Sequence, residues 1–125
     1  MLELILELVD TNTRWSFNMT EIRIGRDPNC DLVFKTDTYP MVSRSHLLIR
    51  QVADRFWGND LNSSSGTFVN GNQIGVAPLS NGDLIQLGTD GPQLKVYIGM
   101  ARRSDEQQTP TRKRILSNED TTKFQ

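Results

Sequence analysis

Three short segments of the sequence carry side chains that suit a phosphate group. Ser43-Arg44-Ser45-His46 lies between an upstream Gly25-Arg26 and a downstream Asn62-Ser63-Ser64-Ser65-Gly66. Hydroxyl groups and the planar guanidinium fork donate hydrogen bonds in a geometry that matches phosphate oxygens. All three segments have loop or strand-end composition, and loops from separate parts of a chain can converge on one site. The segments therefore predict a site that binds phosphate.

The same segments make a poor case for catalysis. A Ser/His hydrolase needs a base beside its nucleophile, an orienting group and an oxyanion hole. Ser43 and Ser45 lie within three residues of His46, the only histidine, at a junction between a loop and an apolar strand. Groups this close in sequence do not indicate a catalytic set. We therefore expect that the chain is not an enzyme.

The 125 residues divide into two parts by composition. Residues 1–100 hold most of the large apolar side chains, which suffice for one modest core. Residues 101–125 are mainly polar and charged, with Phe124 as the only aromatic residue. Such a composition is typical of disordered segments. We predict one domain over residues 1–100 and a flexible, disordered polar tail over residues 101–125.

The charge distribution argues against nucleic acid as a partner. Residues 1–100 carry 8 Lys and Arg against 11 Asp and Glu, a net charge of −3, whereas residues 101–125 carry 6 against 4, a net charge of +2. Binding to nucleic acid rests on clustered cations that neutralise backbone phosphates. A single recognised phosphate needs only one or two well-placed arginines.

Other residue counts exclude further kinds of site. The single Cys30 excludes an intramolecular disulfide and a Cys-cluster zinc site, and the single His46 excludes a multi-histidine metal site. We therefore expect neither a metal nor a cofactor. No apolar run approaches the ~20 residues of a membrane-spanning helix, and the N-terminal segment carries two glutamates and no basic region of a signal peptide. We expect a cytoplasmic protein with no membrane partner.

The apolar pattern predicts many short strands. In residues 2–10 the leucines at every second position predict a strand with one buried face. Shorter strand patterns follow at residues 14–18, 22–24, 32–34, 47–52, 55–61, 67–69, 84–87 and 94–98, with turn residues between them. No stretch of helical length shows a 3.6-residue period. The pattern favours an antiparallel β-sandwich or barrel, with function on the loops at residues 25–31, 35–46 and 61–66.

Four motifs in order along the chain resemble those of the forkhead-associated (FHA) domain. They are GRDPNCDL at residues 25–32, SRSH at 43–46, DLNSSSGTFVNG at 60–71 and NGDLIQLG at 81–88. The resemblance covers about residues 2–100 and implies an all-β fold, an antiparallel β-sandwich of about eleven strands. It also implies binding of phosphothreonine-containing proteins or peptides in kinase-dependent signalling or assembly, rather than catalysis.

The resemblance assigns roles to four residues of the expected site. Arg26 contacts a phosphate oxygen; the alternative is a surface arginine paired with a nearby aspartate, Asp27 or Asp31. Ser43 is the main phosphate-binding serine, and both its hydroxyl and its backbone N–H suit phosphate. Arg44 adds a second cation, which contacts either the phosphate or the peptide backbone. Ser64 keeps the hydroxyl of the family's phosphate-contacting threonine.

Ser65 departs from the family pattern. It replaces an asparagine that holds the loops together and contacts the peptide backbone, and a serine reaches less far and has one hydroxyl in place of an amide. This difference favours the alternative function, a phosphorylation-independent protein-interaction module. Around the site we expect structural roles for Gly25, for His46 as a buried hydrogen-bonding residue, for Gly66, and for Asn70 in a turn.

The C-terminal segment suggests one further ligand. Thr109 and Thr111 lie in a polar, basic segment, and we expect both threonines to be open to a kinase. Once phosphorylated, either could occupy the Arg26/Ser43 site of the same chain or of another copy. The plainer alternative is a solvated end with no such role.

Overall fold

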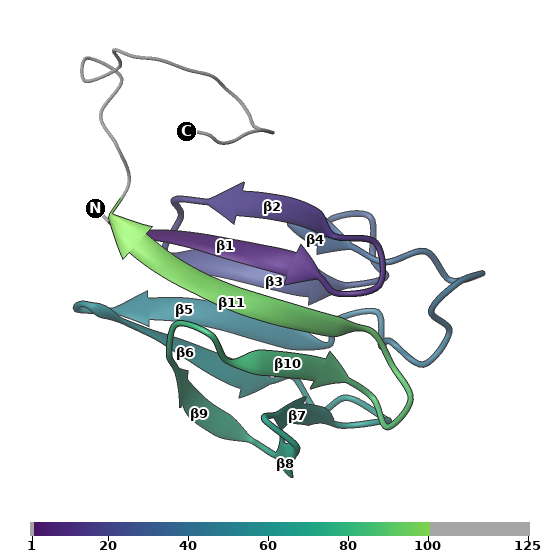
Figure 1. The fold of residues 1–125 in the computed structure, drawn as a ribbon. Coiled ribbons are helices and arrows are strands. Elements are labelled where there is room, and N and C mark those ends of the chain that lie inside the picture. The colour runs from purple at the N-terminus through teal and green to yellow at the C-terminus, as the bar shows by residue number, and fades with distance from the viewer. Residues whose placement is uncertain (1, 101–125) are drawn as a thin grey trace.

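Two facing β-sheets form the part of the chain described by the computed structural model, residues 2–100 (Figure 1). The flexible tail predicted for residues 101–125, and with it the role suggested for Thr109 and Thr111, lies outside the described residues. The strands are β1 (Leu2–Leu8), β2 (Thr13–Phe17), β3 (Glu21–Gly25), β4 (Leu32–Val33), β5 (Leu47–Val52), β6 (Arg55–Asp60), β7 (Thr67–Val69), β8 (Asn72–Gln73), β9 (Val76–Leu79), β10 (Leu84–Leu87) and β11 (Gln93–Met100).

The sheet topology confirms the predicted β-sandwich. One sheet has the strand order β2-β1-β11-β10-β7-β8, and the other has the order β4-β3-β5-β6-β9. Neighbouring strands are antiparallel, except that β3 and β4 run parallel, with Ile24 opposite Leu32. No helix that could cross a membrane occurs within residues 2–100.

Alternating side chains from both sheets form the core. Along β1, Leu4 and Leu6 are fully buried, as the two-residue period predicts. Their counterparts in the other sheet include Ile22 and Ile24 of β3 and Ile49 of β5, all fully buried. Burial of one such side chain stabilises the fold by about 1.5–3 kcal/mol. The core thus provides a rigid scaffold for the loops.

Three details differ from the sequence-based expectation. The pattern did not predict β8, whose two residues are polar and exposed, or β9, which contains Pro78. Proline is tolerated in β9 because this strand lies at the edge of its sheet. Val33 lies in the apolar run at residues 32–34, which predicts a short buried strand, but it is 46% exposed because successive side chains point to opposite faces and Leu32 and Phe34 are the buried ones.

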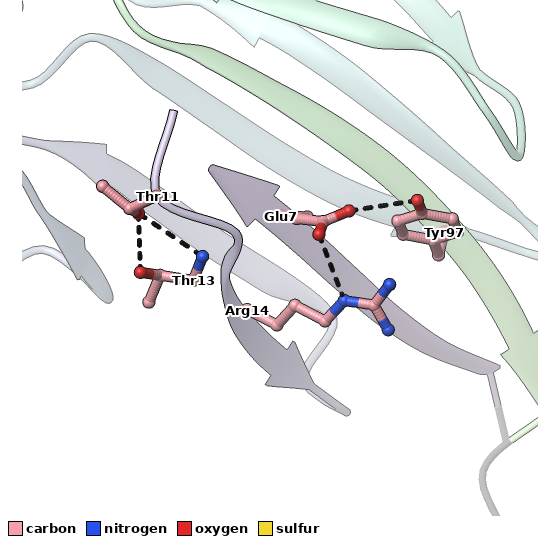
Figure 2. Close-up of polar contacts among 5 residues, drawn as sticks. All are labelled: Glu7, Thr11, Thr13, Arg14 and Tyr97. Carbon is pink, nitrogen blue, oxygen red and sulfur yellow. Dashed lines mark hydrogen bonds and ion pairs between the residues drawn. The ribbon is translucent and has the colours of Figure 1, made fainter. Parts of the chain in front are cut away.

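Polar side chains connect three strands on the solvent face of the larger sheet (Figure 2). Glu7 of β1 accepts a hydrogen bond from the Tyr97 hydroxyl of β11 at 3.1 Å and pairs with Arg14 of β2 at 3.6 Å. The Arg14 guanidinium also lies 5.0 Å from the centre of the Tyr97 ring. Where the adjoining turn enters β2, the hydroxyls of Thr11 and Thr13 are 2.6 Å apart. Exposed contacts of this kind each contribute about 0–1 kcal/mol.

Loops that carry the predicted site lie at one end of the sandwich. The loops that follow β3 and β4, and the loop between β10 and β11, are on the right in Figure 1. Side-chain and backbone hydrogen bonds join the β6–β7 loop to the segment before β5. Segments far apart in the sequence therefore meet at this end.

Candidate phosphate-binding site

Gly25, the last residue of β3, lets two loops pass in close contact. A Cβ atom at this position would lie only 2.1 Å from the backbone oxygen of Arg44, so no larger residue fits without a backbone shift. The next two residues then bond across the gap. The Arg26 N–H donates to the Ser43 carbonyl at 3.2 Å, and the Asp27 N–H donates to the Arg44 carbonyl at 3.1 Å. This pairing brings Arg26 beside Ser43.

The Arg26 side chain is half-buried, and two of its nitrogens donate hydrogen bonds to neighbouring loop residues. Its Nε donates to the Val42 carbonyl, and its Nη1 donates to the Thr36 hydroxyl at 3.1 Å. Arg26 takes part in no salt bridge with a carboxylate of residues 2–100. The carboxylate of Asp31 instead accepts the backbone N–H of Arg23 at 2.8 Å. Arg26 is therefore a positioned cation with donors to offer to an anion, and the alternative of a surface ion pair is wrong.

Ser43 and Ser64 place two hydroxyls side by side. The Ser64 N–H donates to Ser43 Oγ at 3.1 Å, and the two Oγ atoms are 3.4 Å apart. Because Ser43 Oγ accepts the Ser64 N–H, its own proton can be donated to a ligand. The backbone N–H of Ser43 cannot be used in the same way, since it already donates to His46 Nδ1 at 3.0 Å. The expectation that this N–H is available to phosphate is wrong for this structure.

His46 joins the loops from a fully buried position. Its Nδ1 accepts the Ser43 N–H, and its Nε2 lies 2.9 Å from the Gly66 carbonyl. Nδ1 is the acceptor, so Nε2 carries the proton and donates it to Gly66. Both nitrogens are occupied by backbone groups, and neither is left to take a proton from a serine hydroxyl.

Replacing His46 with alanine is expected to lower the melting temperature. The change leaves the Ser43 N–H without its partner and removes one of the two donors to the Gly66 carbonyl, which keeps the Gly88 N–H at 2.9 Å. An unsatisfied buried donor costs about 1–3 kcal/mol. In a domain of this size each kcal/mol lowers the melting temperature by about 4–8 °C. Differential scanning calorimetry of His46→Ala checks this. An unchanged melting temperature combined with lost ligand binding would instead mean that His46 faces the ligand.

The buried, neutral His46 side chain also predicts that the stability of the fold depends on pH. Burial lowers the pKa of His46 from 6.5, although its hydrogen bond to Gly66 and the charge of Asp60 partly oppose this. Because the unfolded chain binds this proton more readily, the stabilisation is complete above about pH 6.5 and is lost as the pH falls below that value. Urea unfolding between pH 7.5 and 5 should show the loss, and His46→Ala should lack it.

Asp60 at the end of β6 organises the β6–β7 loop. Its carboxylate accepts the Ser63 N–H at 3.1 Å, the Ser63 hydroxyl at 2.5 Å and the Thr67 hydroxyl at 2.6 Å. Burial alone would raise the pKa of Asp60, but these hydrogen bonds outweigh it and lower the pKa below 3.8. Ser63 Oγ in turn accepts the Gly66 N–H at 3.1 Å. Asp60 was not among the expected site residues, although an aspartate three residues before a loop serine is a usual turn signal.

The Ser65 hydroxyl is used inside the protein. It donates to the Met41 carbonyl at 2.6 Å and so connects the β6–β7 loop to the loop before β5. A Cβ atom at Gly88 would lie 2.8 Å from Ser65 Oγ, so the contact is tightly enclosed. Because serine has one O–H, the Ser65 side chain has no second donor for a peptide. It thus holds the loops together, which is one of the two roles of the family asparagine.

Arg44 lies exposed beside the candidate site, whereas Asn70 is bonded within a turn away from it. The Arg44 side chain is 74% exposed, and its Nη2 lies 4.0 Å from an Asp27 oxygen, so it is free to move toward a ligand. Asn70 lies in the turn between β7 and β8, where its side chain accepts the Leu84 N–H at 3.0 Å and donates to Asp83 at 3.0 Å. Asn70 therefore orders a hairpin and does not join the loops of the candidate site.

Thr36 is a contact that sequence reasoning missed. It is exposed and lies on the loop between β4 and β5, ten residues after Arg26. Nothing in the pattern of residues 35–42 distinguishes it from Thr38 in the same loop. Only the folded loop brings its hydroxyl to the Arg26 guanidinium.

A family model of the FHA domain matches residues 22–88, more than half of the chain. The chain belongs to the FHA family. The matched range holds Arg26, Ser43, Arg44, Ser64 and Ser65, together with the loops that position them. The resemblance of the four motifs is thus confirmed over the part of the chain that carries the site.

Curated relatives of this FHA domain include two bacterial proteins. The oxoglutarate dehydrogenase inhibitor of Corynebacterium jeikeium is 33% identical over 79 residues, which is 63% of this chain and 53% of the relative. The glycogen accumulation regulator GarA of Mycolicibacterium smegmatis is 32% identical over 79 residues, 63% of this chain and 48% of the relative. Other relatives are longer, and the chain spans no more than 53% of any of these proteins.

Solved structures share the fold of this FHA domain. One of them comes from a study of phosphothreonine-dependent FHA domain interactions. It has a TM-score of 0.70 and 28% sequence identity, and the match covers 79% of this chain and 99% of the other chain. Another is EmbR of Mycobacterium tuberculosis in complex with a low-affinity phosphopeptide. It has a TM-score of 0.71 and 25% sequence identity, and the match covers 82% of this chain and 26% of the EmbR chain.

Proposed function

We propose that this FHA domain is a non-catalytic interaction module that binds phosphothreonine-containing proteins or peptides in kinase-dependent signalling or assembly. The observation that carries the proposal is the Arg26 guanidinium, half-buried and without a salt bridge to any carboxylate of residues 2–100, on a loop paired with that of Ser43. The two related structures described above, whose descriptions name phosphothreonine dependence and a phosphopeptide, support the same ligand. The proposed location is the cytoplasm, where kinases have access to ATP.

The proposed site matches the chemistry of a phosphate ester. Phosphorylation adds about −1.5 to −2 charges and strong acceptor oxygens. Arg26 supplies N–H donors and a charge, while Ser43 and Ser64 supply hydroxyl donors 3.4 Å apart. Arg44, exposed beside them, adds a second cation for the phosphate or the peptide backbone. The described domain is mildly acidic, so recognition depends on these placed donors rather than on a general attraction of anions.

One observation favours the alternative of a phosphorylation-independent interaction module. The Ser65 hydroxyl bonds to the Met41 carbonyl and offers no donor to a peptide backbone. Contacts outside the phosphate would then have to come from other residues. The alternative predicts that a partner binds equally well with and without phosphate.

A degenerate peptide library tests the proposed function. The purified chain is used to select from three libraries that differ only at one fixed position, which is threonine, phosphoserine or phosphothreonine. The proposal predicts enrichment only from the phosphorylated libraries. Equal retention of the threonine library would favour the phosphorylation-independent module. Loss of all retention would oppose both functions.

Phosphothreonine is expected to bind more tightly than phosphoserine. The two differ by one methyl group, and burial of one methyl contributes about 0.8 kcal/mol, or roughly fourfold in affinity. Restriction of the side-chain rotamer by the methyl adds to this value. Fluorescence anisotropy with a pair of peptides that differ only at this residue measures the ratio. Equal dissociation constants would argue against an apolar contact for the methyl beside the phosphate.

A further inference from the structure

The Thr36 hydroxyl is held against the arginine that the proposed function assigns to phosphate. Thr36 Oγ1 accepts a hydrogen bond from Arg26 Nη1 at 3.1 Å, and the residue is exposed to solvent. Backbone bonds shape the loop around it, because the Thr38 and Tyr39 N–H groups both donate to the Lys35 carbonyl, at 3.2 and 2.9 Å. The position of this hydroxyl relative to Arg26 is thus set by the fold.

Further contacts hold the loop between β4 and β5 in place on both sides of Thr36. Arg26 Nε donates to the Val42 carbonyl, at the far end of the loop. The rings of Phe34 and Tyr39 pack edge to face with centroids 5.1 Å apart, and Phe34 is buried. Arg26 and Thr36 therefore lie within one small, closed unit. A group attached to Thr36 Oγ1 would be bonded to an atom that lies 3.1 Å from the guanidinium.

We propose that Thr36 is a phosphorylation site and that its phosphate occupies Arg26, closing the domain to phosphothreonine ligands. The modifying enzyme is a Ser/Thr protein kinase that uses ATP, the same class that must produce the ligands of the proposed function. Thr36 Oγ1 attacks the γ-phosphorus, and a new O–P bond forms. The bond from that phosphorus to the bridging oxygen breaks, ADP leaves, and the hydroxyl proton passes to a base of the kinase.

Charge and tethering both favour the closed state. The phosphate brings acceptor oxygens and about −1.5 to −2 charges to an arginine that makes no salt bridge within residues 2–100. The attached phosphate meets Arg26 within one chain, so its effective concentration reaches the millimolar range of short linkers. An external phosphopeptide must displace it. This inference rests on the proposed function, since Arg26 is the shared contact.

The test uses the 125-residue chain with phosphothreonine at a single genetically encoded position. Phosphothreonine at position 36 is compared with phosphothreonine at position 38, which adds the same charge to the same loop. Calorimetry with a phosphothreonine peptide selected from the library should show affinity at least about tenfold weaker for the protein modified at position 36. The change for the protein modified at position 38 should stay within about threefold.

A second readout follows the attached phosphate itself. Its ³¹P resonance, titrated with pH, should give a second pKa below the ordinary value of about 6 when Arg26 is present. Combining the modification with Arg26→Ala should restore the ordinary value. Circular dichroism confirms that each protein is folded.

The two readouts separate the inference from the proposed function. If the unmodified chain binds no phosphopeptide, the proposed function fails, while the ³¹P titration still tests the contact between position 36 and Arg26. The inference is supported only if affinity falls and the titration depends on Arg26. Unchanged affinity overturns it, and so does an ordinary second pKa that is indifferent to Arg26→Ala.

Discussion

Replacing Arg26 with alanine is expected to weaken phosphopeptide binding by about 10- to 100-fold while the sandwich remains folded. Hydrogen bonds to charged groups contribute about 1.5–3 kcal/mol, which corresponds to that range of affinity. The guanidinium makes no salt bridge within residues 2–100, so its removal leaves no buried carboxylate there without a partner. Calorimetry measures the affinity, and thermal unfolding confirms the fold.

Arg26→Lys is the matched control for this prediction. Lysine keeps the positive charge but lacks the planar fork that bonds to Val42 and Thr36 in the structure. Its affinity should fall between those of the wild type and Arg26→Ala. A folded Arg26→Ala protein that binds as well as the wild type would remove Arg26 from the site.

Replacing Gly25 with alanine is expected to destabilise the domain by about 3 kcal/mol or more. The new Cβ would lie 2.1 Å from the Arg44 carbonyl oxygen and 2.7 Å from its carbon. Overpacking usually costs about 1–3 kcal/mol, and here the obstacle is backbone, which cannot turn aside as a side chain can. Urea unfolding should show a lower midpoint with an unchanged slope.

Gly75→Ala gives a comparison for the same chemical change. A Cβ atom at Gly75 would meet nothing within 4 Å. Its effect should therefore stay within about 0.5 kcal/mol, as for an ordinary surface substitution. If Gly25→Ala were no more destabilising than Gly75→Ala, the close passage of the two loops at Gly25 would not be a constraint on the fold.

The sequence predicted the fold well where one face of a strand is buried. The alternation in residues 2–10 predicted β1, and the structure buries Leu4 and Leu6 as expected. The same reasoning failed for β8 and β9, because a strand of two polar residues and an edge strand with Pro78 carry no such period. Burial on one face is the signal, and β8 and β9 lack it, whereas the edge strand β2 shows it through Trp15 and Phe17.

For the site, the sequence indicated residue types but not their hydrogen-bond partners. Ser43 and Ser64 were expected to act together, and the structure places their hydroxyls 3.4 Å apart. That the Ser65 hydroxyl bonds to Met41, or that Thr36 bonds to Arg26, depends on how three loops pack. Contacts between loops have no sequence period, so only the three-dimensional structure shows them.

The most direct test of the central claim is a calorimetric titration with two peptides of one sequence, one carrying threonine and the other phosphothreonine. We expect measurable, saturable binding of the phosphothreonine peptide and binding at least about tenfold weaker for the threonine peptide, since the charge-assisted hydrogen bonds are lost. Equal affinity for the two peptides would contradict it and would establish the phosphorylation-independent alternative.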